Sequence, residues 1–218
     1  MQLMGTRLII DCIADLHGFY PKLEGGDLLI VAGDLTARDL PAERLILLDW
    51  LANQDYKKKV WIAGNHDNSL VGMKFRKTRD DAAEYLCDSG TEFEGLKIWG
   101  SPWTTWFSEV NPHCTAFMLP EADLTEKWEM IPTDTDILIT HSPPWTILDK
   151  NVEGMQVGST GLMAHHINRL RPKLWVWGHI HEAYGQDGPY QWNNTKYVNA
   201  SHVNEKYKPV NKPIRIIL

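Results

Sequence analysis

Five short segments rich in His, Asp and Gly constrain the fold of this chain, because each begins where an apolar run ends. Together they carry five of the nine histidines, although they are spread from residue 15 to residue 181. Glycine beside most of the polar residues is consistent with tight turns that leave strand ends. The segments are Asp15-Leu16-His17, Gly33-Asp34, Gly64-Asn65-His66-Asp67, Thr140-His141 and Gly178-His179-Ile180-His181.

The apolar runs before these segments are short, and such runs are typical of strands covered on both faces in a layered α/β fold. Helical patterns between them predict helices over Pro41–Asn53, Arg76–Leu86 and Ser159–Leu170. Ligands bind at the carboxyl ends of strands in α/β sheets, so we expect the five segments to share one edge. The predicted strands are Leu8–Ala14, Asp27–Ala32, Lys59–Ala63, Asp136–Thr140 and Leu174–Trp177, followed by Lys196–Ser201 and Ile214–Leu218.

The composition is that of one ordinary globular domain. The 218 residues contain no apparent linker or repeat, so we expect a single domain over residues 1–218. A formal net charge of −6 argues against an extended nucleic acid as partner. No apolar run reaches the roughly 20 residues that span a bilayer, and Met1–Arg7 is too short and polar for a secretory signal. With three cysteines that lack metal-type spacing, we expect a cytoplasmic protein without a membrane partner.

The residue types in the segments suit a pair of metal ions. Borderline divalent ions accept mixed imidazole and carboxylate ligands. Alternation places two side chains on one side of an extended segment, as in Asp15/His17 and His179/His181. A shared carboxylate holds two ions about 3.5–4 Å apart, which is the spacing used in phosphoryl displacement. Asp34 is the expected bridge, because the tight turn after Gly33 presents it alone.

The five segments, in this order, resemble the signature of the calcineurin-like metallophosphoesterase superfamily, and the resemblance spans roughly residues 6–201. It implies an α/β fold, a four-layer α/β/β/α sandwich in which two mixed β-sheets are flanked by helices. Further segments resemble the metallophosphoesterase-domain-containing branch, which includes phosphodiesterases of cyclic nucleotides and aryl diesters. These segments are Cys87–Gly90, Ile98–Phe107, Lys127-Trp128, Ile131-Pro132, Thr135–Pro144, Arg171–Lys173 and His181–Gly185.

The resemblance also implies two divalent ions, with Mn, Fe or Zn expected first and Mg or Co also possible. His66 would stay off the metals as a catalytic residue. Apart from the resemblance, Asp67 is a second catalytic candidate that could orient the His66 ring, although adjacent side chains often diverge. His179 is present here, whereas some members of the branch replace it by Gly, so a complete two-metal enzyme is expected. The first ion would be held by Asp15, His17, Asp34 and His181, and the second by Asp34, Asn65, His141 and His179.

These assignments predict a binuclear metal-dependent phosphoesterase, and specifically a phosphodiesterase of small nucleotide diesters, cyclic ones included. A metal-bridging hydroxide would attack phosphorus in line, while His66 stabilises the developing charge or protonates the leaving oxygen. A phosphomonoesterase is the alternative, followed by a nuclease and a non-catalytic scaffold. Trp145 could stack on a nucleobase, and Arg38 could clamp a phosphate.

The other four histidines are expected to be structural or surface residues, because a lone histidine usually is. His165 and His166 lie inside a predicted helix, and His202 follows the last motif. His113 is near no motif and receives the same interpretation.

Overall fold

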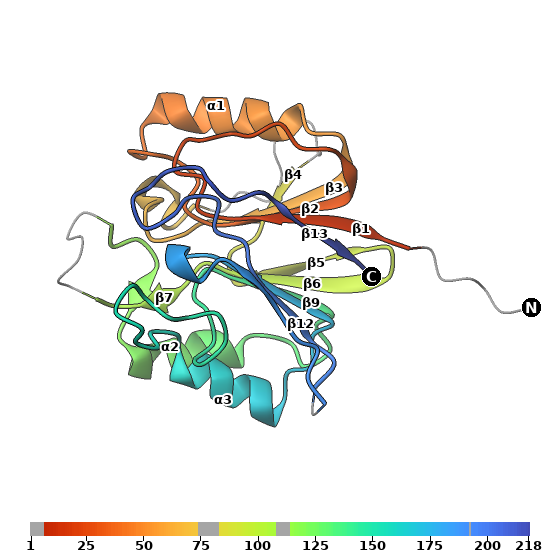
Figure 1. Ribbon diagram of the computed structural model, residues 1–218, viewed down its shortest axis with the longest axis vertical. Coiled ribbons are helices and arrows are strands. Elements are labelled where there is room, and N and C mark those ends of the chain that lie inside the picture. Colours follow the sequence, from red (N-terminus) through yellow and green to blue (C-terminus); the bar gives the residue numbers. More distant parts are fainter. Residues whose placement is uncertain (1–6, 74–82, 108–113, 192) are drawn as a thin grey trace, which may run out of the picture.

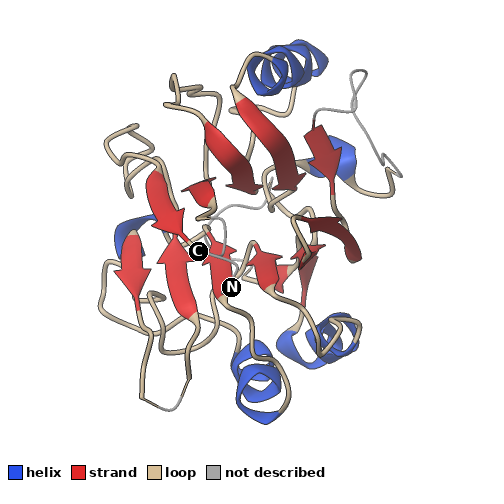
Figure 2. Ribbon diagram, turned by 90° about the vertical axis from the view of Figure 1, so that its right-hand side faces the viewer, coloured by secondary structure: helices blue, strands red, loops and turns tan. Residues whose placement is uncertain are grey.

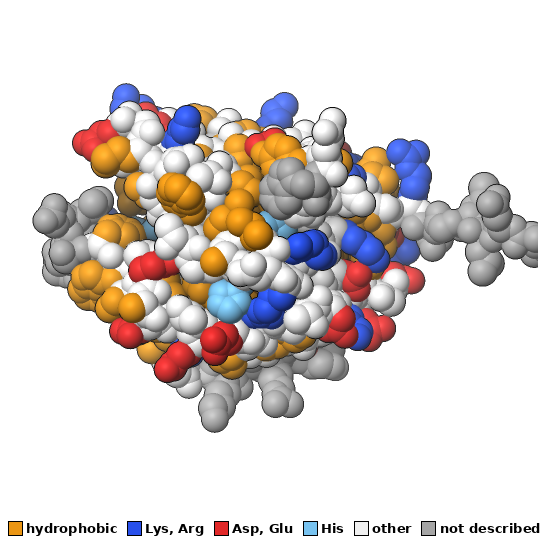
Figure 3. Space-filling model, turned by 90° about the horizontal axis from the view of Figure 1, so that it is seen from below, with side chains coloured by type: hydrophobic (Ala, Val, Ile, Leu, Met, Phe, Trp, Pro, Cys, Tyr) orange, Lys and Arg blue, Asp and Glu red, His pale blue; other side chains and the backbone are white. Residues whose placement is uncertain are grey.

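Two β-sheets pack face to face and carry helices on their outer faces, which gives four layers (Figure 1). The computed structural model describes residues 7–73, 83–107, 114–191 and 193–218. Figure 2 shows the strands in the middle with helices on either side. The face that carries α2 and α3 mixes acidic, basic and apolar side chains (Figure 3). The helices are α1 (Pro41–Ala52) on the first sheet, and α2 (Glu121–Glu129) and α3 (Thr160–Asn168) on the second.

Both sheets are mixed, as expected, because parallel central strands are joined by antiparallel strands at or near the edges. The first sheet has the order β13-β1-β2-β3-β4, with β1 (Ile9–Ile13), β2 (Gly26–Ala32), β3 (Tyr56–Ile62), β4 (Ala83–Tyr85) and β13 (Ile214–Ile217). The second has the order β11-β12-β10-β9-β6-β5, with β5 (Ser89–Phe93), β6 (Leu96–Ser101), β9 (Ile137–Thr140), β10 (Leu174–Trp177), β11 (Gly185–Asp187) and β12 (Lys196–Asn199). Shorter elements are the pair β7 (Thr104–Thr105) and β8 (Met118–Leu119), and the 3-10 turns η1 (Asn68–Leu70) and η2 (His181–Ala183).

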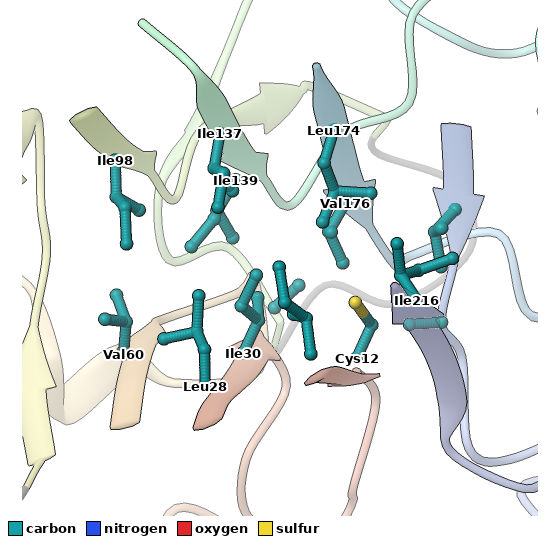
Figure 4. Close-up of a cluster of buried hydrophobic side chains, with 14 of the residues drawn as sticks. Cys12, Leu28, Ile30, Val60, Ile98, Ile137, Ile139, Leu174, Val176 and Ile216 are labelled. Atoms are coloured by element: carbon teal, nitrogen blue, oxygen red, sulfur yellow. The ribbon is translucent and has the colours of Figure 1, made fainter. Parts of the chain in front are cut away.

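The main core lies between the sheets, and alternation along each strand divides the apolar residues between two cores. In β2, Leu28 and Ile30 face the opposite sheet, whereas Leu29 and Val31 join the cluster under α1. Burial of both faces explains why these strands are continuously apolar in sequence. Figure 4 shows Cys12, Leu28, Ile30 and Val60 of the first sheet opposite Ile98, Ile137, Ile139, Leu174 and Val176 of the second.

Most predicted elements are confirmed, with shifts only at their ends. All seven predicted strands are present, and Pro41–Asn53 and Ser159–Leu170 correspond to α1 and α3. Pro41 begins α1, and the Ser159 hydroxyl caps α3 by accepting a hydrogen bond from the Leu162 amide at 3.0 Å. None of the helices in the described part of the chain is both long and apolar enough to cross a membrane.

The predicted helix over Arg76–Leu86 is wrong in the part that the structure describes. Ala83–Tyr85 forms β4, which pairs in parallel with β3, while residues 74–82 lie outside the described residues. Ala83 and Tyr85 are buried and Glu84 between them is not, which is the two-residue period of an edge strand. Hydrogen bonding to the open edge of β3 therefore outweighs a weak helical pattern.

His166 is a structural residue, as expected, and fastens α3 to the second sheet. Its Nε2 lies 2.6 Å from the Tyr197 hydroxyl and 2.6 Å from Nδ2 of Asn193. The amide can only donate, so Nε2 is an acceptor and the ring is neutral. Burial, followed by the charge of Arg171, lowers the pKa of His166 to about 4.

This pKa predicts a loss of stability in acid. Below about pH 6.5 the unfolded chain protonates His166, whereas the fold resists protonation down to about pH 4. The contribution of the neutral His166 ring to the free energy of unfolding is therefore complete above pH 6.5 and is lost as the pH falls toward 4. His166→Phe should remove about 3 kcal/mol of the decrease in unfolding free energy across this range. Urea titrations in chelator measure it, and His165→Gln, one position earlier on α3, is the control. An unaltered pH slope in His166→Phe contradicts the assignment.

Candidate metal centre

The five motif segments meet at one edge of the sandwich, where the carboxyl ends of strands from both sheets converge. A backbone hydrogen bond joins the two sheets there, from the Ala14 amide to the Ala200 carbonyl at 2.8 Å. Within the first sheet, the Asp15 amide donates to the Gly33 carbonyl at 2.9 Å. Across the sheets, the His179 amide donates to the Asp15 carboxylate at 3.0 Å. Residues far apart in sequence are thereby held in one small volume.

The first group comprises four buried side chains on three of these turns. Their ligand atoms all lie within 4.8 Å of one another, as a metal ion would require. Nε2 of His17 lies 3.3 Å from Nε2 of His181 and 3.6 Å from Oδ2 of Asp34. Nε2 of His181 lies 3.7 Å from Oδ1 of Asp15. The four residues are the ones that the sequence assigned to the first ion.

A second group lies on the other side of Asp34. Oδ1 of Asn65 lies 3.1 Å from Nε2 of His141 and 3.0 Å from Nδ1 of His179. Nε2 of His141 also lies 3.4 Å from Oδ1 of Asp34. These are the four residues assigned to the second ion. The two carboxylate oxygens of Asp34 thus face different groups, which is the arrangement of a bridging ligand.

Hydrogen bonds to the backbone orient the second group. Nδ1 of His141 donates to the Ala32 carbonyl at 3.0 Å, which turns Nε2 toward Asp34. Nδ2 of Asn65 donates to the Cys114 carbonyl at 3.3 Å, so its Oδ1 faces the two imidazoles. Such outer contacts select the tautomer and amide orientation that metal ligands need.

The protonation states of most residues in the centre suit the binding of cations. Burial lowers the pKa of His17 to about 4 and that of His179 to about 3, so both rings are neutral at pH 7. Burial alone would raise the pKa of Asp34, but the neighbouring His141 and His66 hold it well below its usual range. Conversely, burial opposes a proton on His141, yet Asp34 raises its pKa to about 9. A metal ion and a proton therefore compete for that nitrogen.

Several ligand candidates have a left-handed backbone, which is rare outside glycine. The φ angles are 50° at Asp15, 42° at His17, 52° at Asp34 and 71° at His179. Such strain persists only where the surrounding structure enforces it, and it concentrates at functional sites. A Cβ on Gly64 would lie 2.2 Å from Oδ1 of Asp34, so this glycine is required by close approach.

His66 lies beside the two groups, with its ring between Asp34 and a cysteine. Its Nε2 is 3.8 Å from Oδ2 of Asp34, and its amide donates to Oδ1 of Asp34 at 2.9 Å. Its Nδ1 lies 3.2 Å from Sγ of Cys114. Burial raises the pKa of Cys114 to about 11, so the thiol keeps its proton and can donate it to Nδ1. In the tautomer that accepts this bond at Nδ1, His66 carries its own proton on Nε2, toward the metal centre.

Asp67 has a different environment from the one we expected. Its carboxylate accepts hydrogen bonds from the Gly64 amide at 2.8 Å and the Leu35 amide at 3.1 Å, instead of orienting the His66 ring. It therefore joins the turn after β3 to the turn that carries Asp34. Burial, followed by the charge of Asp34, raises its pKa to about 8.

The remaining sequence candidates lie outside these groups. Trp145 is 42% exposed, and Arg38 is exposed while its backbone amide donates to Glu43 at 3.0 Å. The backbone of His202 is next to the segment that carries Asp15, because the His202 amide donates to the Ala14 carbonyl at 2.7 Å. His113 lies outside the described residues.

Sequence reasoning missed three residues that touch the centre. Cys114 belongs to the three cysteines without metal-type spacing, yet it contacts His66. The rings of Phe107 and His179 lie 5.2 Å apart, and Tyr207 packs 4.8 Å from His17. Cys114 and Tyr207 lie in loops without a motif, and Phe107 ends the segment Ile98–Phe107, whose resemblance assigns it no role in the site.

A buried Asp/His cluster at the carboxyl edge of a four-layer sandwich is the site of a metallophosphoesterase. A model of the calcineurin-like phosphoesterase family matches residues 9–183, and the chain belongs to this family. It is 38% identical to metallophosphoesterase domain-containing protein 1 of Homo sapiens and of Mus musculus, over 98% of this chain and 71% of theirs. Among solved structures, TT1561 of Thermus thermophilus is similar in fold, with a TM-score of 0.58 at 17% identity over 89% of both chains.

We expect Asp67 to stabilise the site through the backbone. Asp67→Ala leaves the buried amides of Gly64 and Leu35 without their acceptor, which should lower the unfolding free energy by about 1–3 kcal/mol. Asp67→Asn keeps a carbonyl oxygen and should restore part of this loss. Urea unfolding in chelator compares the two variants. Equal stability of Asp67→Ala and the wild type would contradict the assigned role.

Proposed function

We propose that this protein is a binuclear metal-dependent phosphodiesterase that hydrolyses small nucleotide diesters, cyclic ones included. The observation that carries the proposal is the position of Asp34, whose Oδ2 faces His17 and whose Oδ1 faces His141. Membership of the calcineurin-like phosphoesterase family supports phosphoric ester hydrolysis as the reaction.

Asp15, His17, Asp34 and His181 would hold the first ion, while Asp34, Asn65, His141 and His179 would hold the second. Mixed imidazole, carboxylate and amide donors favour Mn, Fe or Zn, and they also accept Co or Mg. Two such ions, when bound, lower the pKa of water and neutralise the charge on phosphoryl oxygens. The hydrogen bonds of His141 and Asn65 to the backbone orient two of the side chains that would hold these ions.

His66 is the proposed catalytic residue. In its tautomer with a proton on Nε2, it can donate to the leaving oxygen or to a phosphoryl oxygen as the ester bond breaks. The Cys114 thiol selects this tautomer by donating to Nδ1. Cys114 is therefore a positioning residue, which acts through His66.

The aromatic surroundings of the centre support a diester as substrate. Phe107 lies on the side of His179 and Tyr207 on the side of His17, so apolar surface borders both metal positions. A diester carries a second organic substituent that such surface can contact, whereas a monoester presents an additional charge. Trp145 and Arg38 are both exposed, which leaves the one free to stack on a base and the other free to bind a phosphate.

The proposed partner is a small phosphodiester, without a membrane or an extended nucleic acid. The net charge of −6 supports this, as does the mixture of acidic and basic side chains on the α2 and α3 face (Figure 3). Cytoplasmic location is supported by Cys12, Cys87 and Cys114, which are all free thiols.

A substrate panel tests the proposed function. Purified protein loaded with Mn, Zn or Mg is assayed with 2′,3′- and 3′,5′-cyclic nucleotides, an aryl diester and an aryl monoester. We expect the highest kcat/KM for a diester. A higher kcat/KM for the monoester would replace the proposal by a phosphomonoesterase, and inactivity with all metals would indicate a non-catalytic scaffold.

His66→Ala should separate chemistry from metal binding. We expect kcat to fall by about 10²–10⁴-fold, because the proton donor is lost, while metal content stays unchanged. Cys114→Ala should cause a smaller loss, about 10–100-fold, because only the tautomer of His66 is released. Cys114→Ser keeps a donor and should retain most activity. Loss of metal from His66→Ala would contradict its assignment.

Metal content distinguishes the shared ligand from a single-site ligand. Asp34→Ala should remove both ions, because both groups use this carboxylate, whereas His179→Ala should leave the first ion in place. Inductively coupled plasma mass spectrometry after dialysis measures the stoichiometry. Glu182→Gln removes an exposed carboxylate next to His181 and serves as the control. Retention of both ions by Asp34→Ala would contradict the bridging role.

A further inference from the structure

Tyr207 lies at the tip of a loop that follows the last motif and turns back to the metal centre. The tip is closed by its own backbone, since the Tyr207 amide donates to the Asn204 carbonyl at 2.8 Å and the Asn204 amide to the Lys208 carbonyl at 2.9 Å. At the base of the loop, Nδ2 of Asn211 donates to the Ser201 carbonyl at 2.9 Å. The fold thus holds the tip in a defined position.

The ring of Tyr207 packs against three histidines of the centre. Its centroid lies 4.8 Å from that of His17, 5.1 Å from that of His181 and 6.0 Å from that of His66. Two of these histidines are proposed ligands of the first ion, and the third is the proposed catalytic residue. Tyr207 is therefore the residue of the loop that borders both the proposed position of the first ion and the proposed catalytic residue.

The conformation of Tyr207 is costly and is not explained by core packing. Its φ is +55°, which is unfavourable for a bulky aromatic residue, and 46% of its surface is exposed. A residue that only filled the core would be buried. A strained backbone that presents a half-exposed ring at a metal centre points instead to a ligand.

The hydroxyl of Tyr207 remains available for such a ligand, because it has no hydrogen-bond partner within the described residues. A tyrosine hydroxyl keeps its proton at neutral pH and can donate it in a hydrogen bond. At the same tip Lys206 pairs with Glu205 at 3.9 Å, whereas the exposed Lys208 adds a positive charge that would attract an anion. Ring, donor and positive charge together match an organic phosphate.

We propose that Tyr207 is a substrate-binding residue of this centre. Its hydroxyl donates a hydrogen bond to a non-bridging phosphoryl oxygen, and its ring contacts the organic substituent that a diester has and a monoester lacks. It forms and breaks no covalent bond: water adds to phosphorus, the ester oxygen leaves with a proton, and Tyr207 keeps its own. The inference rests on the proposed function for its substrate class.

Two variants separate the two contributions. Tyr207→Phe removes the hydroxyl alone, and Tyr207→Ala removes the ring as well. Tyr184→Phe is the control. The Tyr184 hydroxyl donates to the Lys212 carbonyl at 2.9 Å, and this bond involves no residue of the metal centre. Calorimetry measures binding of inorganic phosphate and AMP to the Mn-loaded proteins, with metal content determined in parallel. Kinetics compare an aryl diester with an aryl monoester.

We expect Tyr207→Phe to weaken phosphate binding about tenfold at unchanged metal content, as for loss of one neutral hydrogen bond. Tyr207→Ala should weaken AMP binding further and should lower kcat/KM for the diester more than for the monoester. Dissociation constants within twofold of the wild type for both variants would overturn the inference, as would loss of metal from Tyr207→Phe. If the wild type hydrolyses neither ester but Tyr207→Phe still weakens phosphate binding, the proposed function fails and the binding role stands.

Discussion

The shared carboxylate of Asp34 is the constraint on which the rest of the site depends. Its two oxygens face two different groups of ligand candidates, so its position determines both. That position requires a left-handed backbone and a neighbour without a side chain, because a Cβ on Gly64 would overlap Oδ1. It also requires the His66 amide, which donates to the same oxygen. One buried anion thereby joins the turns after β2 and β3.

The packing of the two sheets brings the ligand candidates of the second sheet to Asp34, which lies on the first sheet. Face-to-face packing of two apolar surfaces brings the ends of β9 and β10 beside those of β1 and β2. The Asp15 carboxylate then accepts the His179 amide across the junction, so a ligand of one group also orients a residue of the other. The geometry of the candidate metal centre and the packing of the sheets are consequently coupled, and a rigid core is what permits strained turns at its edge.

The side of the site that faces a substrate is built differently from the metal side. His66 contacts Cys114, from a loop distant in sequence, and the rings of Phe107 and Tyr207 border the two groups. Short polar motifs hold the metal side, whereas long-range packing forms the substrate side.

The sequence by itself determined the strand ends, the residues that gather in two groups around Asp34, and the four-layer class, because these follow from local apolar runs and from a resemblance carried by short motifs. It could not determine β4, whose three residues form a strand only because β3 offers an open edge. Nor could it determine that Asp67 holds backbone amides, that Cys114 pairs with His66, or that Tyr207 reaches the site. Those contacts join residues through space, and their free energy depends on burial and geometry that only the tertiary structure creates.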